Sequence, residues 1–197
     1  MTAWQNQPII RVRKGRYLFN FFINISAGVG GKCSMEGKRL TSYAMEELEC
    51  PKCGHKHSLK KYKVINVTEK AKLKEEIMKN RLYQFSCEEC EYMAPLTYDS
   101  LYVDSQRNIM IYMAPVMNAE IKAEIAELEQ EKGIDKRLVD NINDLKEKIM
   151  IADNHLDDRV IEIIKIMYID QMKKEMEDDT LLNILFDYNR DNYCFLV

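Results

Sequence analysis

Two stretches of the sequence decide the fold: ECPKCGHKHSLKKYKVINV, from Glu49 to Val67, and FSCEECEYMAP, from Phe85 to Pro95. Each stretch contains two cysteines with two residues between them. This spacing is typical of zinc knuckles, because a tight turn brings both thiolates to one ion. Two such turns predict one tetrahedral structural Zn²⁺ site. Its four expected ligands are Cys50, Cys53, Cys87 and Cys90.

Three other chemistries also use paired cysteines, and the pattern alone leaves them open. A Cys-x-x-Cys pair can be a redox-active dithiol, four cysteines can form disulfides in an oxidising compartment, and four sulfurs can hold an iron centre. Pro51 and Gly54 favour the knuckle, since proline presets the turn and glycine tolerates a positive φ. His55 and His57 are expected to lie beside the sulfurs or exposed, rather than to bind the ion. Cys33 is expected to be an ordinary thiol, like Cys194.

The segment between the two cysteine pairs is longer than usual for a zinc site. Thirty-three residues separate Cys53 from Cys87, against about 15–20 in common spacings. Alternation of apolar and polar residues predicts a strand at 57–67, helical spacing predicts a helix within 69–80, and a return strand is expected at 81–86. The excess length is therefore an inserted short helix between two strands.

Finer signals place further elements around the second pair. We expect Thr68 to cap the inserted helix, and Leu73 and Ile77 to share its buried face. Strands are predicted at 92–98 and 109–113, joined around the turn-rich DSQRN.

The last third of the chain has helical periodicity. One helix is expected to begin at Asn118 and another at Asp140 or Asn141. DDRVIEIIKIMYIDQMKKEM, residues 157–176, has apolar residues on more than one face, which predicts a central buried helix. LLNILFDYNRDNYCFLV, residues 181–197, is a hairpin signal.

These elements define an α+β fold class. We expect a zinc-ribbon-like β module with an inserted short helix, followed by a helical region and a C-terminal hairpin. The corresponding boundaries are a leader at 1–44, the module at 45–116, and the helical region with its hairpin at 117–197.

The expected leader contains RVRKGRYLFNFFINISAGVGG, residues 11–31. Its basic flank and apolar run resemble a signal peptide, but two asparagines interrupt the run, which falls short of the roughly 20 apolar residues of a membrane span. We favour a misassigned leader with translation starting at Met35 or Met45. A true signal and a buried strand at 17–25 are the alternatives.

The cysteine pairs and the residues that follow them resemble the CpXC domain family of bacteria and archaea. The resemblance covers CPKCG, the long gap, FSCEEC and APLTYDSLYVDSQRNIMIYMAP, from about Leu48 to Pro115. LKEKIMIADNHLDDRVIEIIKIMY is similar to the helical segment that often follows. The resemblance implies a zinc-ribbon-like module and no reaction. Because Cys-Glu-Glu-Cys lacks the proline of the first pair, we expect a looser second turn.

Charge and motifs restrict the function. The net charge of −3 argues against a molecule that binds polyanions with its whole surface, although residues 52–81 contain ten Lys or Arg and only three Glu. There is no glycine-rich phosphate loop and no His-Glu-x-x-His motif. We expect no catalytic residues and a cytoplasmic, metal-stabilised module that binds an unidentified protein partner, with no membrane contact.

Two further functions stay open. The basic segment could bind nucleic acid, since clustered cations are sufficient for phosphate contacts. The candidate contacts are Lys56, Lys60, Lys61 and Lys63. A thiol redox protein is the third hypothesis.

Overall fold

The computed structural model describes residues 39–130, 132–175, 184–189 and 192–196. The expectations for residues 1–38, including a strand at 17–25 and the state of Cys33, lie outside this part of the chain. None of the described helices is long and apolar enough to cross a membrane.

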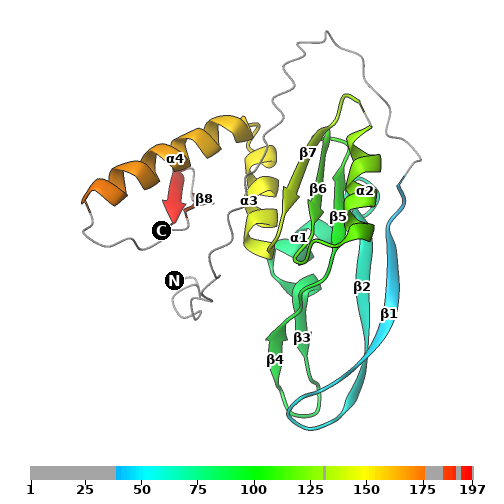
Figure 1. Cartoon of the computed structure of the whole chain (residues 1–197). Coiled ribbons are helices and arrows are strands. Elements are labelled where there is room, and N and C mark those ends of the chain that lie inside the picture. Colours follow the sequence, from blue (N-terminus) through cyan, green and yellow to red (C-terminus); the bar gives the residue numbers. More distant parts are fainter. Residues whose placement is uncertain (1–38, 131, 176–183, 190–191, 197) are drawn as a thin grey trace. The chain divides into compact units, whose positions relative to one another are not determined.

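The central element is a five-stranded mixed sheet (Figure 1). Its spatial order is β1 (Ser42–Glu49), β2 (Lys56–Asn66), β5 (Ser100–Asp104), β6 (Ile109–Met113) and β7 (Asp135–Val139). The pairs β1–β2 and β5–β6 are antiparallel, whereas β2–β5 and β6–β7 are parallel. Parallel neighbours need a crossover, and the chain between β2 and β5 provides one that contains the second cysteine pair.

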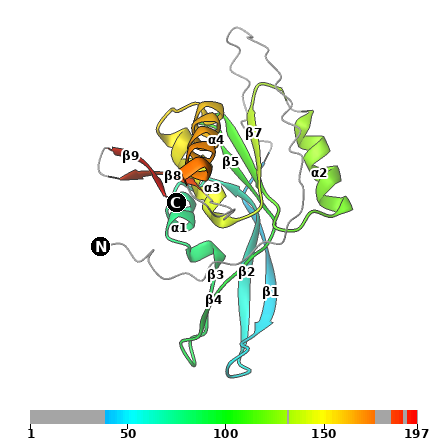
Figure 2. The same cartoon turned by 60° about the vertical axis from the view of Figure 1, so that its left-hand side comes forward.

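Helices cover both faces of the middle strands. The helices α1 (Lys72–Met78) and α3 (Ile142–Asp153) pack on one face, and α2 (Ala119–Glu129) packs on the other (Figures 1 and 2). Every residue of β5 and β6 is buried as a result. The main core therefore lies on the two faces of the sheet.

Two smaller hairpins complete the described structure. A 3₁₀ turn, η1 (Arg81–Tyr83), leads into β3 (Gln84–Ser86), which pairs antiparallel with β4 (Met93–Pro95). Near the C-terminus, β8 (Leu185–Asn189) pairs with β9 (Asn192–Leu196). The expected α+β fold class, the inserted helix and the C-terminal hairpin are confirmed.

Several local expectations need correction. Thr68 does not cap α1, because this helix begins after Ala71. The Thr68 hydroxyl instead accepts a hydrogen bond from the backbone N–H of Ser105 (2.8 Å). The strand expected at 81–86 begins with η1 and is only three residues long, and the one at 92–98 is equally short. By contrast, the side chains of Asn118 and Asn141 cap α2 and α3 as expected.

The strands β5 and β7 were not predicted from the sequence. The sequence of β5, SLYVD, has no alternation because both of its faces are covered. The sequence of β7, DKRLV, is mostly polar because it lies at a sheet edge. Since β7 pairs with β6, the sheet takes strands from both sides of the boundary expected at residue 116.

A helix forms where one was predicted at 157–176, but the prediction that this helix is central and buried is wrong. Within α4 (Asp158–Glu175), Ile161 is buried against α3 and β8, but Val160, Ile163, Ile166 and Met167 are all exposed. The physical reason is that the face of α4 turned toward α3 carries charged residues.

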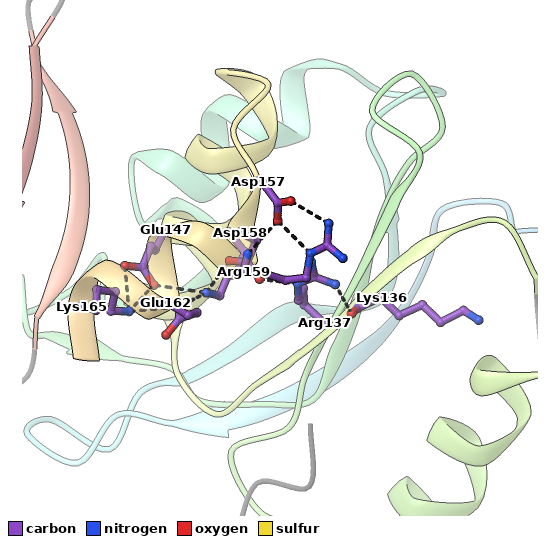
Figure 3. A network of polar contacts seen from close by, with 9 residues as sticks. Lys136, Arg137, Glu147, Asp157, Asp158, Arg159, Glu162 and Lys165 are labelled. Carbon is purple, nitrogen blue, oxygen red and sulfur yellow. Dashed lines mark hydrogen bonds and ion pairs between the residues drawn. The ribbon is translucent and has the colours of Figure 1, made fainter. Parts of the chain in front are cut away.

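Those charged residues form the network shown in Figure 3. Lys148 of α3 forms ion pairs with Asp158 (2.6 Å) and Glu162 of α4. Lys165 of α4 donates to both carboxylate oxygens of Glu147 (3.0 Å each). Glu147 also accepts the backbone N–H of Phe186 (2.6 Å), so the network joins α3, α4 and β8.

The neighbouring charges decide how Lys148 titrates. Burial lowers the pKa of the Lys148 ammonium, but Asp158 and Glu162 outweigh burial and raise that pKa above its ordinary value. Removing one member of such a network leaves an uncompensated buried charge, which costs roughly 3–5 kcal/mol. The network therefore keeps α4 in the rotation that turns its charged face inward.

The core assignment predicts a large effect for one central side chain. Ile111 of β6 has no exposed surface, so Ile111→Ala should lower the free energy of unfolding by about 2–5 kcal/mol, measured by urea denaturation. The matched control is Val116→Ala, because Val116 is exposed, and its effect should stay within about 0.5 kcal/mol. Equal effects of the two substitutions would contradict the assignment.

Candidate metal centre

The first cysteine turn connects β1 to β2. The backbone N–H of Cys50 donates to the carbonyl of His55 (2.8 Å), and the N–H of Gly54 donates to the carbonyl of Cys50 (2.9 Å). Gly54 has a φ of +74°, a conformation that glycine adopts without strain. This conformation directs the chain back into β2, and the turn presents Cys50 and Cys53 on one side.

The second cysteine turn connects β3 to β4 and repeats the first. The N–H of Cys87 donates to the carbonyl of Tyr92 (2.8 Å), and the N–H of Glu91 donates to the carbonyl of Cys87 (3.0 Å). Glu91 takes the left-handed conformation of Gly54, with a φ of +57°. The expectation of a looser second turn is therefore wrong, since the same two hydrogen bonds close it without a proline.

The two turns bring four sulfur atoms together. The Sγ atoms of the four paired cysteines all lie within 4.8 Å of one another. The Sγ atom of Cys50 is 3.7 Å from that of Cys90, and the Sγ atom of Cys53 is 3.6 Å from that of Cys87. Ligands about 2.3 Å from a tetrahedral ion would be about 3.8 Å apart. The cluster thus fits one tetrahedral ion with four sulfur ligands.

The same sulfur distances exclude disulfides among these residues. A disulfide has a sulfur–sulfur distance of about 2.0 Å, and all four cysteines are free thiols. The contacts of 3.7 and 3.6 Å also run between the two turns, so each sulfur of one Cys-x-x-Cys pair lies against a sulfur of the other pair. A redox cycle that oxidises one pair would therefore have to separate it from its neighbours.

A small apolar cluster supports the sulfurs. Cys50 and Cys87 are buried against Phe85, with Leu48 and Leu59 packed around them, whereas Cys53 is exposed. Its buried residues are distinct from those of the two main core clusters, although Leu96 packs against both this cluster and the first of them. The hairpin tips consequently have little apolar packing of their own.

The electrostatics of the sulfurs favour a bound cation. Burial raises the pKa of the Cys50 thiol, but the backbone N–H groups of Cys53 and Lys52 outweigh it and lower that pKa to about 7. The backbone N–H of His55 lowers the pKa of the Cys53 thiol, but desolvation and the three other sulfurs outweigh it and raise that pKa to about 12. The neighbouring sulfurs thus favour ionisation of Cys50 and oppose ionisation of Cys53, and a bound cation would favour the thiolate form of both.

The two histidines lie outside the four-sulfur cluster, as expected. Nε2 of His57 is 3.2 Å from Sγ of Cys87, and the His57 ring packs edge-on against Phe85 at a centroid distance of 5.3 Å. The exposed His55 ring packs against His57 at 4.8 Å. Nε2 of His57 therefore lies within hydrogen-bonding distance of one sulfur of the cluster.

The four candidate nucleic-acid contacts do not all lie on one face of β2, although Lys56, Lys60 and Lys63 are exposed. Because side chains alternate along a strand, Lys56 and Lys60 lie on one face of β2, and Lys61 lies on the other. Lys63 lies at the register shift between β1 and β2. The Lys60 ammonium lies over the Tyr43 ring, 4.6 Å from its centroid.

The neighbouring strand compensates part of this charge. Lys61 forms an ion pair with Glu46 of β1 (2.6 Å). The sequence of β1, SYAMEELE, contains three glutamates and no cation. The basic strand is therefore paired with an acidic one.

Sequence reasoning missed the buried charges on α4, although a signal was present. Asp158, Glu162 and Lys165 follow at intervals of four and three residues, which places them on one face of a helix. A carboxylate pair at a helix start, such as Asp157 and Asp158, also suits the helix dipole without being buried. Asp158 is in fact buried and also forms an ion pair with Arg137 of β7.

Two equivalent cysteine turns at the ends of two hairpins define a zinc-ribbon-like module, and their four sulfurs could hold a metal ion. The family described as CpXC protein matches residues 48–165, which is more than half of the chain. The chain belongs to the CpXC family. Comparisons with curated proteins and with solved structures found no match.

The geometry of the sulfurs predicts a spectroscopic signature. Metal-free protein should bind one Co²⁺ per chain and show the intense visible bands of tetrahedral cobalt with sulfur-to-metal charge transfer, because only four thiolates converge at the site. Cys87→Ser should weaken these bands, whereas Cys194→Ser should not, since Cys194 lies on β9. The weak bands of octahedral cobalt would contradict the four-sulfur assignment.

Proposed function

We propose that this chain is a non-catalytic protein-interaction module held by a structural Zn²⁺ ion. The observation that carries the metal assignment is the cluster of four sulfurs within 4.8 Å. Zinc is the ion for which a tetrahedral four-cysteine shell is the common structural site. Such a shell leaves no position for water or substrate, so the ion would stabilise the fold rather than activate a reagent.

The place of the cluster supports a structural role. The ion would join the turn between β1 and β2 to the turn between β3 and β4, and few apolar side chains support these turns. Zinc-finger peptides gain roughly 10–16 kcal/mol from zinc binding. A contribution of this order would replace the packing that the two hairpin tips lack.

A reduced cluster of this kind suits a compartment that keeps thiols reduced, and we place the protein in the cytoplasm on that ground. An iron centre would use the same four sulfurs and is distinguished by elemental analysis. The redox alternative requires a pair that oxidises readily, and the short contacts between the two turns do not favour it.

The zinc proposal predicts composition and local stability. Purified protein should contain one Zn²⁺ per chain, measured by elemental analysis with native mass spectrometry. Chelation should speed amide hydrogen exchange at 48–60 and 84–96, whereas β5 and β6 should stay protected, because their core does not include the cysteines.

Cysteine variants provide the control for this experiment. Cys87→Ser should lose the ion and show the same fast exchange without chelator, whereas Cys194→Ser should keep the zinc content of the natural sequence. If all four paired thiols react with a thiol reagent before chelation as fast as after it, the structural zinc site is wrong.

A protein partner is favoured over nucleic acid by the contacts of the basic strand. Lys60 and Lys61 already interact with Tyr43 and Glu46, and the four candidate lysines do not share one face. Exposed apolar side chains on α4 instead provide a surface of the kind that proteins bind.

A salt titration separates the two functions. We expect no specific binding of labelled single- or double-stranded DNA or RNA at about 50 mM salt, and the same result for Lys56→Glu. An affinity that falls steeply between about 50 and 200 mM salt, as counterion release requires, and that Lys56→Glu reduces would overturn the choice of a protein partner.

A further inference from the structure

The helix α4 has the opposite orientation from an ordinary surface helix. Its charged residues Asp158, Glu162 and Lys165 face α3 (Figure 3) and are largely buried. Its outward face carries branched and long apolar side chains instead. Surface helices of globular proteins normally turn their apolar stripe inward. The orientation of α4 is the reverse of this pattern, since its apolar face is turned to solvent.

Four side chains form this outward apolar face, which we call the α4 strip. Their exposed fractions are 50% for Val160, 57% for Ile163, 64% for Ile166 and 66% for Met167. Residues three, four and seven apart lie on one side of a helix, so the four side chains adjoin one another. Polar residues follow the strip toward the C-terminus, beginning with Asp170.

The buried network prevents α4 from hiding this strip. Turning Ile163 and Ile166 inward would break the ion pairs of Lys148 with Asp158 and Glu162. It would also take Lys165 away from Glu147. The strip is thus held toward solvent by interactions on the opposite side of the helix.

The two isoleucines of the strip and the charged residues at its two ends form a self-complementary sequence. Arg159, Ile163, Ile166 and Asp170 follow at intervals of four, three and four residues, which is the spacing of a coiled-coil seam. The seam has two isoleucines in its middle, a cation at one end and a carboxylate at the other. A second copy in antiparallel orientation would place its Asp170 against Arg159 and its Ile166 against Ile163.

We propose that the α4 strip binds the same strip of a second copy of this chain, as an antiparallel helix pair with two-fold symmetry. An antiparallel pair matches opposite charges at both ends of the seam, whereas a parallel pair would place Arg159 against Arg159 and Asp170 against Asp170. Val160 and Met167, which flank the seam on one side, would also pack on each other across the axis. A two-fold interface requires this kind of self-complementary surface.

The present partners of the two charges do not oppose this pairing. Arg159 forms an ion pair with Asp157 (2.6 Å), and Asp170 forms one with Lys174 (2.6 Å). Both pairs are well exposed, and exposed pairs contribute little to stability. The strip is smaller than the roughly 800 Å² per partner of a standard interface, so the expected dimer is reversible and depends on concentration.

This inference deepens the proposed protein-interaction role by naming the partner, and it rests on that role but not on the metal. Sedimentation velocity of the zinc-loaded full chain should show a monomer–dimer equilibrium. Ile163→Glu should shift the equilibrium to monomer without changing zinc content or melting temperature. Val116→Glu is the matched control, because it puts the same charge at an exposed apolar residue away from α4, and it should leave the dimer unchanged.

Charge exchange tests the antiparallel orientation. Arg159→Asp and Asp170→Arg should each weaken self-association, because each places like charges at both ends of the seam. An equimolar mixture of the two variants should form heterodimers, since every seam end then pairs a cation with a carboxylate. The double variant Arg159→Asp/Asp170→Arg should regain self-association.

The outcomes separate this inference from the proposed function. A zinc-containing chain that stays monomeric at every concentration, or a dimer that Ile163→Glu leaves intact, would overturn the α4 pairing and leave the metal module standing. A dimer in which the mixed variants do not associate would overturn the antiparallel arrangement. A chain without zinc that still dimerises through α4 would contradict the metal assignment alone.

Discussion

The convergence of four sulfur atoms is the constraint on which the path of the chain depends. The first two sulfurs lie at the turn between β1 and β2, and β2 then runs away from that turn. The chain can supply the other two only by returning to the same end of the sheet. The inserted α1, η1 and the β3–β4 hairpin make this return, and α1 packs into the main core on the way. The insertion is thus both the crossover between parallel strands and the segment that brings the second pair of cysteines to the first.

The two cysteine turns show that sequence difference does not imply structural difference. Each turn is closed by two backbone hydrogen bonds and has one residue with positive φ, a glycine in the first and a glutamate in the second. A non-glycine residue in this region is strained by about 1 kcal/mol or more and persists only where its surroundings determine it. A metal ion bound by both turns would hold Glu91 in this conformation, because the ion requires the same sulfur geometry from each turn.

How much of the structure could be predicted from the sequence depends on how far apart in the chain the interacting residues lie. The two cysteine turns, the inserted helix and the caps at Asn118 and Asn141 depend on residues a few positions apart, so local spacing was sufficient to predict them. The strand β5 was missed because burial on both faces removes alternation. The rotation of α4 was predicted wrongly because it depends on Glu147 and Lys148, which lie on another helix.

The orientation of α4 links the stability of the chain to the proposed binding of a partner. Burying an ion pair rarely stabilises a protein more than apolar packing would, so α4 gains no clear advantage in stability from turning Asp158, Glu162 and Lys165 toward α3. The ion pairs instead fix the rotation of α4 about its axis. They can form in one arrangement of the two helices, whereas apolar side chains can pack in several. A helix held this way presents Ile163 and Ile166 at a defined angle to solvent. In the proposed pairing, a second copy that covers these two side chains would offset the cost of exposing them.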